Sequence, residues 1–155
     1  MPEHPLRQPK SLNELFLYRL SQLTASARLP VVRLCEREHG ITRREWRLLS
    51  ALALGEGITS SALAERSLLD RARTSRTVTS LVAKGLLLRS AAAADRREAV
   101  LALTDAGRAT YETLLPQVAA INRELLSVLD DGELDALAHA LKHLTAQAER
   151  MAARP

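Results

Sequence analysis

Residues 70–104 read DRARTSRTVTSLVAKGLLLRSAAAADRREAVLALT, and this stretch decides the fold. Asp70 is a favourable helix N-cap, and Gly85 can end the same helix in a left-handed conformation. Two apolar segments follow at residues 86–89 and 98–103, and an alanine-rich loop joins them. The pattern predicts a basic helix followed by a β-hairpin, although alanine is a poor strand and turn former.

A shorter helix precedes this basic helix. Thr59 can cap it, it reaches about Arg66, and the turn Ser67-Leu68-Leu69 leads to Asp70. Two short helices joined by a tight turn are the signature of a helix-turn-helix. With the hairpin after them they form a winged helix-turn-helix, a motif that reads duplex DNA.

Helices are also predicted before this motif. Residues 11–28 have helical apolar spacing, and Pro30 separates them from a second helical segment at residues 31–38. The sequence Thr42-Arg43-Arg44-Glu45 is a capping box, which starts the helix that contains Trp46.

Two long helices are predicted after Thr104, and Asp130 with Glu133 caps the second. Their leucines repeat with coiled-coil spacing, which favours a homodimer. We therefore expect a mainly α fold with a small β-wing, in which a winged helix-turn-helix lobe is joined to a helical dimerisation lobe. The expected parts are a flexible arm (1–10), the dimerisation lobe (11–38 and 105–151) and the DNA-binding lobe (42–104).

The charge of the chain is unevenly distributed. The net charge is +4, and residues 59–100 carry eight Lys and Arg against four acidic residues. Residues 104–155 carry five basic against eight acidic residues. This asymmetry indicates a middle region that faces a polyanion. Aromatic residues make up only 3% of the chain, which disfavours stacking on single-stranded nucleic acid.

Other classes of protein are disfavoured by absent patterns. No apolar run approaches the ~18–20 residues of a membrane span, and the N-terminus lacks a signal-peptide core. With its single cysteine, Cys35, the chain is expected in the cytoplasm, at the nucleoid. No nucleotide-binding, hydrolase or metalloprotease motif occurs, so neither an enzyme nor a cofactor is expected.

The chain resembles the MarR family of bacterial transcription regulators along almost its whole length. Five segments carry the resemblance in the family's order: GITRREWRLL at 40–49, ITSSALAER at 58–66, RTVTSLVAKGLL at 76–87, DRR at 95–97 and LTDAG at 103–107. The alanines at 91–94 depart from the usual turn residues of the wing. The resemblance implies a triangular homodimer on a pseudo-palindromic operator, acting mostly as a repressor. It also implies release by a small effector bound between the lobes, which we expect to be an aromatic carboxylate or its thioester.

The residues expected to contact DNA lie in two places. The leading end of the basic helix can reach base edges and phosphates, and a wing arginine can enter a narrow minor groove. The set comprises Arg71, Arg73, Thr74, Ser75, Arg76, Arg96 and Arg97. Asp95 is expected to orient the guanidinium of Arg97.

The effector pocket implied by the resemblance lies near the first helices. Arginine can pair with a carboxylate and tryptophan can flank an aromatic ring, although core packing is the simpler explanation for Trp46. The candidates are Tyr18, Arg19, His39, Trp46 and Arg47.

Three alternatives remain open. Cys35 has basic neighbours and suggests a redox-sensing regulator. His139 and His143 have a spacing able to bind a metal, but no metal site is expected on such a solvated helix. A helical module that contacts proteins instead of DNA is the third alternative.

Overall fold

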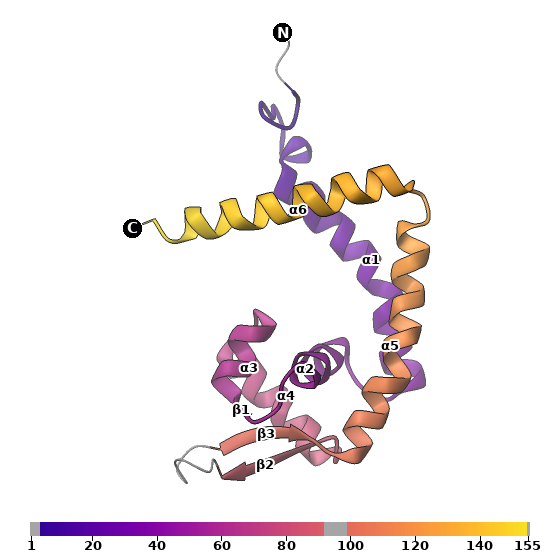
Figure 1. Ribbon diagram of the computed structural model, residues 1–155, viewed down its shortest axis with the longest axis vertical. Coiled ribbons are helices and arrows are strands. Elements are labelled where there is room, and N and C mark those ends of the chain that lie inside the picture. The colour runs from indigo at the N-terminus through magenta and orange to yellow at the C-terminus, as the bar shows by residue number, and fades with distance from the viewer. Residues whose placement is uncertain (1–3, 92–98, 155) are drawn as a thin grey trace. The chain divides into compact units, whose positions relative to one another are not determined.

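The computed structural model describes residues 4–91 and 99–154, and Figure 1 shows the course of the chain. Its elements in order are a 3-10 helix η1 (Leu12–Glu14), α1 (Phe16–Glu38), α2 (Arg43–Ala53), β1 (Ile58–Thr59), α3 (Ser60–Ser67), α4 (Arg71–Ala83), β2 (Leu87–Ala91), β3 (Ala99–Leu103), α5 (Asp105–Leu126) and α6 (Asp131–Ala152). The chain divides into two compact units, residues 1–118 and 119–155. This division falls within α5, and the lobe boundaries expected from the sequence stay a prediction. No helix of the described ranges is long and apolar enough to cross a membrane.

The expected class, mainly α with a small β-wing, is confirmed. The sheet has three antiparallel strands in the order β1-β3-β2, and the hairpin of β2 and β3 pairs Leu87 with Leu103. The sequence analysis missed β1, in which Ile58 pairs with Leu101. A strand of two residues has no periodicity of its own, and only its distant partner creates it.

The helix-turn-helix is formed by α3 and α4, with the caps that the sequence predicts. The side chain of Thr59 accepts a hydrogen bond from the amide of Ala62 at 3.2 Å, and Asp70 accepts from the amide of Arg73 at 2.9 Å. Leu68, in the turn between the helices, has a φ of 52°. This left-handed conformation at the C-cap lets the amides of Leu68 and Leu69 bond the last carbonyls of α3.

The core of the winged lobe lies between α2, α3, α4 and the sheet, which Figure 1 shows gathered together. Helix α2 is amphipathic and buries most of its leucines against the helix-turn-helix. Fully buried side chains come from every one of these layers and from α5: Leu48, Leu49, Leu52, Leu63, Val78, Leu81, Leu101 and Leu114. Helix α4, whose exposed face is basic, is thus anchored in the core by its apolar face.

Three expected boundaries are wrong. The first α-helix begins at Phe16 and not at residue 11, because Leu15 is extended between η1 and α1. Pro30 does not separate two helices, because α1 continues from Phe16 to Glu38 with the proline inside it. A proline removes one helical hydrogen bond, and the burial of Leu34 and Cys35 at the end of α1 favours continuing the helix. Strand β2 extends to Ala91, past the residue where the loop was expected to start, because cross-strand pairing overrides the weak propensity of alanine.

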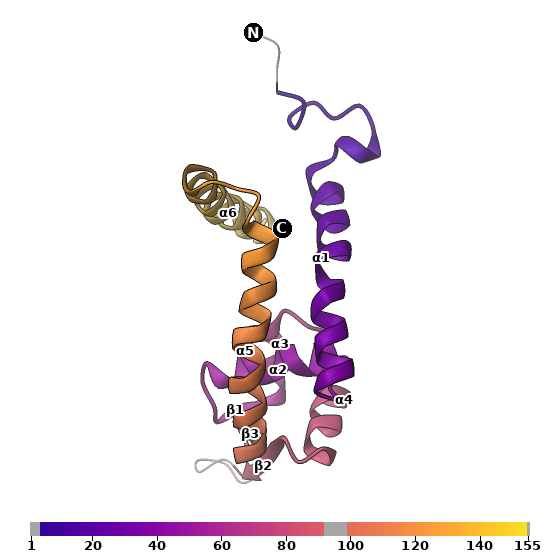
Figure 2. The same cartoon turned by 90° about the vertical axis from the view of Figure 1, so that its right-hand side faces the viewer.

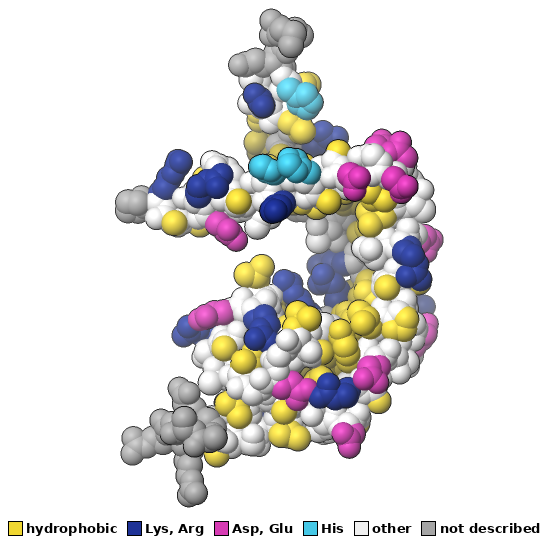
Figure 3. Space-filling view, viewed as in Figure 1, with side chains coloured by type: hydrophobic (Ala, Val, Ile, Leu, Met, Phe, Trp, Pro, Cys, Tyr) yellow, Lys and Arg dark blue, Asp and Glu magenta, His cyan; other side chains and the backbone are white. Residues whose placement is uncertain are grey.

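Helix α6 begins as predicted and leaves its leucines uncovered within the chain. Asp130 and Glu133 form a capping box, with bonds of 2.8 and 3.0 Å. Side chains of the predicted seam are exposed, among them Leu137, Leu141 and Leu144. Hydrophobic side chains are visible along this helix in Figure 3.

The junction between the sheet and α5 is held at Gly107. Strand β3 leads directly into α5, as Figure 2 shows, and the amide of Thr104 donates to the carbonyl of Leu86 at 3.1 Å. The hydroxyl of Thr104 accepts from the amide of Gly107 at 2.9 Å. A Cβ at position 107 would overlap the carbonyl oxygen of Leu86. This close backbone approach explains the glycine, because any side chain would push α5 away from Leu86, the residue before β2.

We expect Gly107→Ala to lower the free energy of unfolding by about 1–3 kcal/mol, as other overpacked sites do. Urea unfolding followed by circular dichroism measures the change. Gly132→Ala is the matched control, because its new Cβ would approach a side-chain atom, Asp130 Oδ1 at 3.3 Å, and would overlap no backbone atom. Equal stability of the two variants would contradict the proposed tight junction.

Candidate nucleic-acid interface

Helix α4 presents most of its expected DNA-contacting side chains to solvent. Exposed side chains from its leading end are Arg71, Arg73, Ser75 and Arg76. The Asp70 cap orients this end, where arginines can reach base edges and phosphates.

Thr74 is the exception, and its expected place on the DNA-facing surface is wrong. Its side chain is 0% exposed, on the same face of α4 as the buried Val78 and Leu81. Helical spacing of three and four residues places all three toward the core. The Thr74 hydroxyl has no hydrogen-bond partner within the described residues, and neither has the buried hydroxyl of Ser67.

Arg71 is already engaged on the protein surface. Its guanidinium lies 3.0 Å from a carboxylate oxygen of Glu65 on α3, and both side chains are highly exposed. Exposed pairs of this kind contribute about 0–1 kcal/mol, so DNA can recruit Arg71 at little cost.

The tip of the wing, with Asp95, Arg96 and Arg97, lies outside the described residues. The base of the wing adds a residue that the sequence analysis missed. Arg89 on β2 donates to the hydroxyl of Thr79 on α4 at 3.1 Å. Its sequence signal was a basic residue at the end of the predicted first strand.

A groove of about 530 Å³ lies between the start of α2 and the exposed face of α4. Its lining is polar and comes from both helices: Thr42, Arg44, Glu45, Arg73, Arg76, Thr77 and Ser80. Arg44 and Thr42 were known only as parts of a capping box, so the sequence alone had no reason to place them beside the basic helix.

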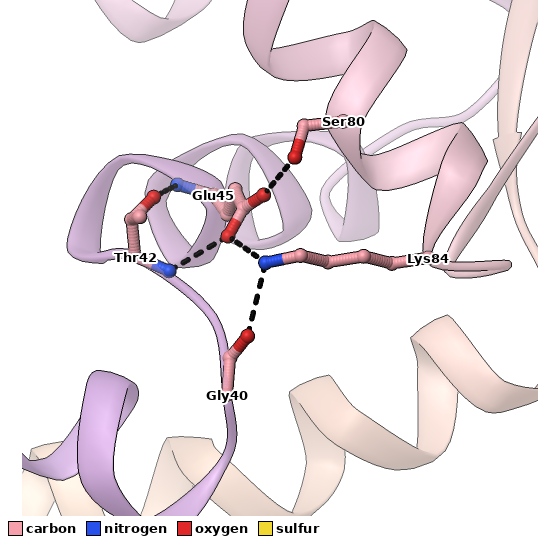
Figure 4. Close-up of polar contacts among 5 residues, drawn as sticks. All are labelled: Gly40, Thr42, Glu45, Ser80 and Lys84. Carbon is pink, nitrogen blue, oxygen red and sulfur yellow. Dashed lines mark hydrogen bonds and ion pairs between the residues drawn. The ribbon is translucent and has the colours of Figure 1, made fainter.

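The carboxylate of Glu45 joins the start of α2 to the end of α4, as Figure 4 shows. Its side chain is only 3% exposed. One carboxylate oxygen accepts from the hydroxyl of Ser80 at 2.7 Å, and the other accepts from Lys84 Nζ at 2.8 Å and the amide of Thr42 at 2.7 Å. Lys84 also donates to the carbonyl of Gly40 at 2.9 Å. The capping box is therefore extended into a clamp on α4.

These bonds determine the ionisation of Glu45. Burial by itself would raise the pKa of the carboxyl group, but hydrogen bonds from Lys84, Ser80 and the Thr42 amide outweigh it. The charge of Lys84 acts in the same direction, and the pKa of Glu45 lies below its ordinary value. The site therefore holds a carboxylate that is already neutralised by its own lysine.

The five expected effector residues do not line one pocket within a single chain. Tyr18 and His39 lie near opposite ends of α1, about 30 Å apart along a straight helix. Arg19 and Arg47 are exposed, and none of the five lines the groove between α2 and α4.

Trp46 packs in the core, in keeping with the simpler of its two explanations. It is 8% exposed, and its ring stacks on Tyr111 of α5 at 5.6 Å between centroids. A second contact joins α5 to the end of α1, where His39 Nε2 lies 3.3 Å from Nε2 of Gln117. Tyr111 and Gln117 were not identified from the sequence, because only the packing of α5 brings them to these partners.

The structure argues against a redox role for Cys35. The thiol is buried, and burial, reinforced by the charge of Glu36, raises its pKa despite the opposing effect of Arg43. A buried thiol with a raised pKa is a poor nucleophile, which disfavours the alternative of a redox-sensing regulator.

The histidine pair on α6 is close but lacks further ligands. The rings of His139 and His143 lie 4.3 Å apart between centroids. Within the described ranges no group of three or more His, Cys, Asp or Glu residues is arranged to hold a metal ion.

Comparison with known proteins gives consistent matches. Residues 39–98 match the sequence model of the MarR family. The homoprotocatechuate degradative operon repressor of Escherichia coli is 26% identical over 110 residues, which are 71% of this chain and 74% of that protein.

Solved structures extend the likeness to the rest of the chain. A MarR family transcriptional regulator from Silicibacter pomeroyi is 28% identical with a TM-score of 0.76, and the match covers 95% of this chain and 98% of that one. The PcaV transcriptional regulator from Streptomyces coelicolor is 25% identical with a TM-score of 0.69, over 85% of this chain and 96% of that one.

The clamp predicts an acid-sensitive stability. Because the pKa of Glu45 is lowered on folding, its contribution is complete above the unfolded pKa of about 4.3 and is lost as the pH falls through the folded pKa. We expect Glu45→Gln to lower the free energy of unfolding by about 1–3 kcal/mol at pH 7. It should also flatten the decline of stability below about pH 4.

Urea unfolding at a series of pH values measures both effects. Glu124→Gln is the control, because Glu124 is exposed on α5 and its change should leave the wild-type pH profile intact. An unchanged acid limb in Glu45→Gln would show that the clamp is not a source of the pH dependence.

Proposed function

We propose that the chain is a transcriptional regulator of the MarR family, and that it is a repressor that binds a pseudo-palindromic operator in duplex DNA. The support is the match of residues 39–98 to the model of that family and the likeness to a solved member over 95% of the chain. The members of this family are regulators, not enzymes. A regulator of this kind acts on DNA in the cytoplasm, at the nucleoid. The observation that carries the proposal is the capped helix α4, whose exposed arginines face outward while its opposite face is anchored in the core.

The proposed contacts are divided between bases and backbone. Arg73 and Arg76 lie three residues apart on α4, so both reach the same side of the helix. Arginine can bond guanine O6 and N7 together, and Ser75 can bond bases or phosphates. Arg71 is assigned to either, and Arg96 and Arg97 of the wing are proposed to reach phosphate and the minor groove, with Asp95 orienting Arg97.

The proposed active form is a homodimer. Exposed leucines at positions 137, 141 and 144 repeat along α6 with the spacing of a helix-packing seam. A second copy of the chain would cover them, and a two-fold dimer matches the symmetry of a palindromic operator. Two recognition helices must then lie about 34–36 Å apart to enter successive major grooves.

The proposed signal is a small aromatic carboxylate or its thioester. The support is the relative named for an operon that degrades homoprotocatechuate, which is itself an aromatic acid. A ligand that binds better to a dimer with the wrong helix spacing lowers operator affinity by linkage.

Operator binding is tested by fluorescence anisotropy on the DNA upstream of the chain's own gene, with a scrambled duplex beside it. We expect much tighter binding to the native fragment. Arg76→Ala should weaken operator binding by roughly tenfold to a hundredfold and reduce discrimination against the scramble. Arg28→Ala removes an equal charge from the exposed surface of α1 and is the control.

Equal, weak and salt-sensitive binding to both duplexes would contradict sequence-specific binding and would show that the basic surface binds polyanions without specificity. Absence of binding to either would favour the protein-interaction module.

Effector release is tested by titrating aromatic acids and their thioesters into the preformed complex. At least one compound should lower operator affinity and, by reciprocity, bind more weakly when operator is present. The same operator affinity with and without every such compound would remove the effector part of the proposal.

A further inference from the structure

We propose that the groove between α2 and α4 is a phosphate-binding site for the DNA backbone, in which Arg44 supplies a contact that the recognition helix alone cannot make. This inference rests on the proposed function and adds to it a residue from outside the helix-turn-helix. Arg44 would increase affinity for any duplex sequence and fix the position of α4 in the major groove of the DNA.

Positive charge from two elements converges in this groove. Arg44 comes from the first turn of α2, while Arg73 and Arg76 come from α4, and all three line the same groove. Guanidinium groups that share a groove repel one another, and a bound oxyanion removes this cost. Arginine suits that anion well, because its planar fork matches the geometry of phosphate.

These three arginines have no internal counter-ion in the described part of the chain. The ion pairs there are made by Arg71, Lys84 and Arg108. Glu45 is the one carboxylate of the groove lining, and its charge is already taken up by Lys84. The positive charge of Arg44, Arg73 and Arg76 is therefore available to a ligand.

The lining also offers free hydrogen-bond donors. Thr42 uses its hydroxyl oxygen to accept from the amide of Glu45 at 3.1 Å, which leaves the hydroxyl hydrogen for an acceptor in the groove. Thr77, by contrast, donates its hydroxyl to the carbonyl of Arg73 at 2.9 Å. The hydroxyl of Thr42 and the guanidinium groups therefore remain as donors for an anionic oxygen.

A DNA phosphate is favoured over a free anion by the place of the groove. Arg73 and Arg76 belong to the exposed side of the helix proposed to enter the major groove. The phosphate backbone of a duplex bound on that side would run beside α4, next to the start of α2. Phosphate contacts of this kind position a protein without reading sequence.

The test compares Arg44→Ala, Arg44→Lys and the control Arg28→Ala on operator and scrambled duplexes over a range of salt concentrations. We expect Arg44→Ala to weaken binding to both duplexes by the same factor, roughly tenfold at 0.1 M salt. The slope of log affinity against log salt should fall by about one for each protomer. Arg44→Lys should restore most of the slope, because it keeps the charge.

A second experiment locates the phosphate. Single neutral methylphosphonates are placed along each operator strand, and affinity is measured with the wild-type protein and with Arg44→Ala. We expect one position in each half-site where the methylphosphonate weakens binding of the wild-type protein. At that position it should not weaken binding of Arg44→Ala further, because the variant has already lost the contact. Circular dichroism and the unfolding midpoint confirm that the variant is folded.

The possible outcomes separate the two proposals. If the wild-type protein binds neither duplex, the proposed function fails and the phosphate site fails with it. If the wild-type protein binds but Arg44→Ala matches the control, only the phosphate site is overturned.

Two further results would also overturn it. Loss of affinity for the operator alone would make Arg44 a base-reading residue. Unchanged DNA affinity with lost response to an aromatic acid would assign the groove to the effector.

Discussion

The carboxylate of Glu45 makes the polar contacts on which the proposed DNA-facing surface depends, because it adds a fixed hydrogen-bonded link to the apolar packing of α2 on α4. It caps its own helix, accepts from Ser80 in the last turns of α4, and pairs with Lys84, which also bonds the carbonyl of Gly40. A buried charge is tolerated only when its hydrogen bonds are satisfied. That requirement holds the end of α1, the start of α2 and the end of α4 in one geometry.

The polar groove is a consequence of this geometry. With α2 held across α4, Arg44 lies beside Arg73 and Arg76, and the one acidic group among them is neutralised from below. The apolar face of α4 is buried at the same time, and Thr74 goes with it. The surface left for a ligand is therefore basic on a rigid support, which suits recognition of a phosphate backbone better than a mobile loop would.

Local patterns predicted much of the fold and part of the site. The caps at Thr42, Thr59, Asp70 and Asp130 all form as expected, because a cap depends on groups within a few residues. The same locality explains the errors. Pro30 reads as a break until the burial of Leu34 is known, and Thr74 reads as exposed until the core face of α4 is known.

The sequence by itself determined the helix-turn-helix, the hairpin after it, the basic helix and its caps, and the resemblance to a family of regulators. Each of these depends on short-range spacing or on motifs in order. Only the tertiary structure decided that Glu45 meets Ser80 and Lys84, that Trp46 stacks on Tyr111, and that Arg44 joins the arginines of α4. These partners lie about 30 to 65 residues apart along the chain, and no local pattern encodes a meeting that depends on how whole helices pack.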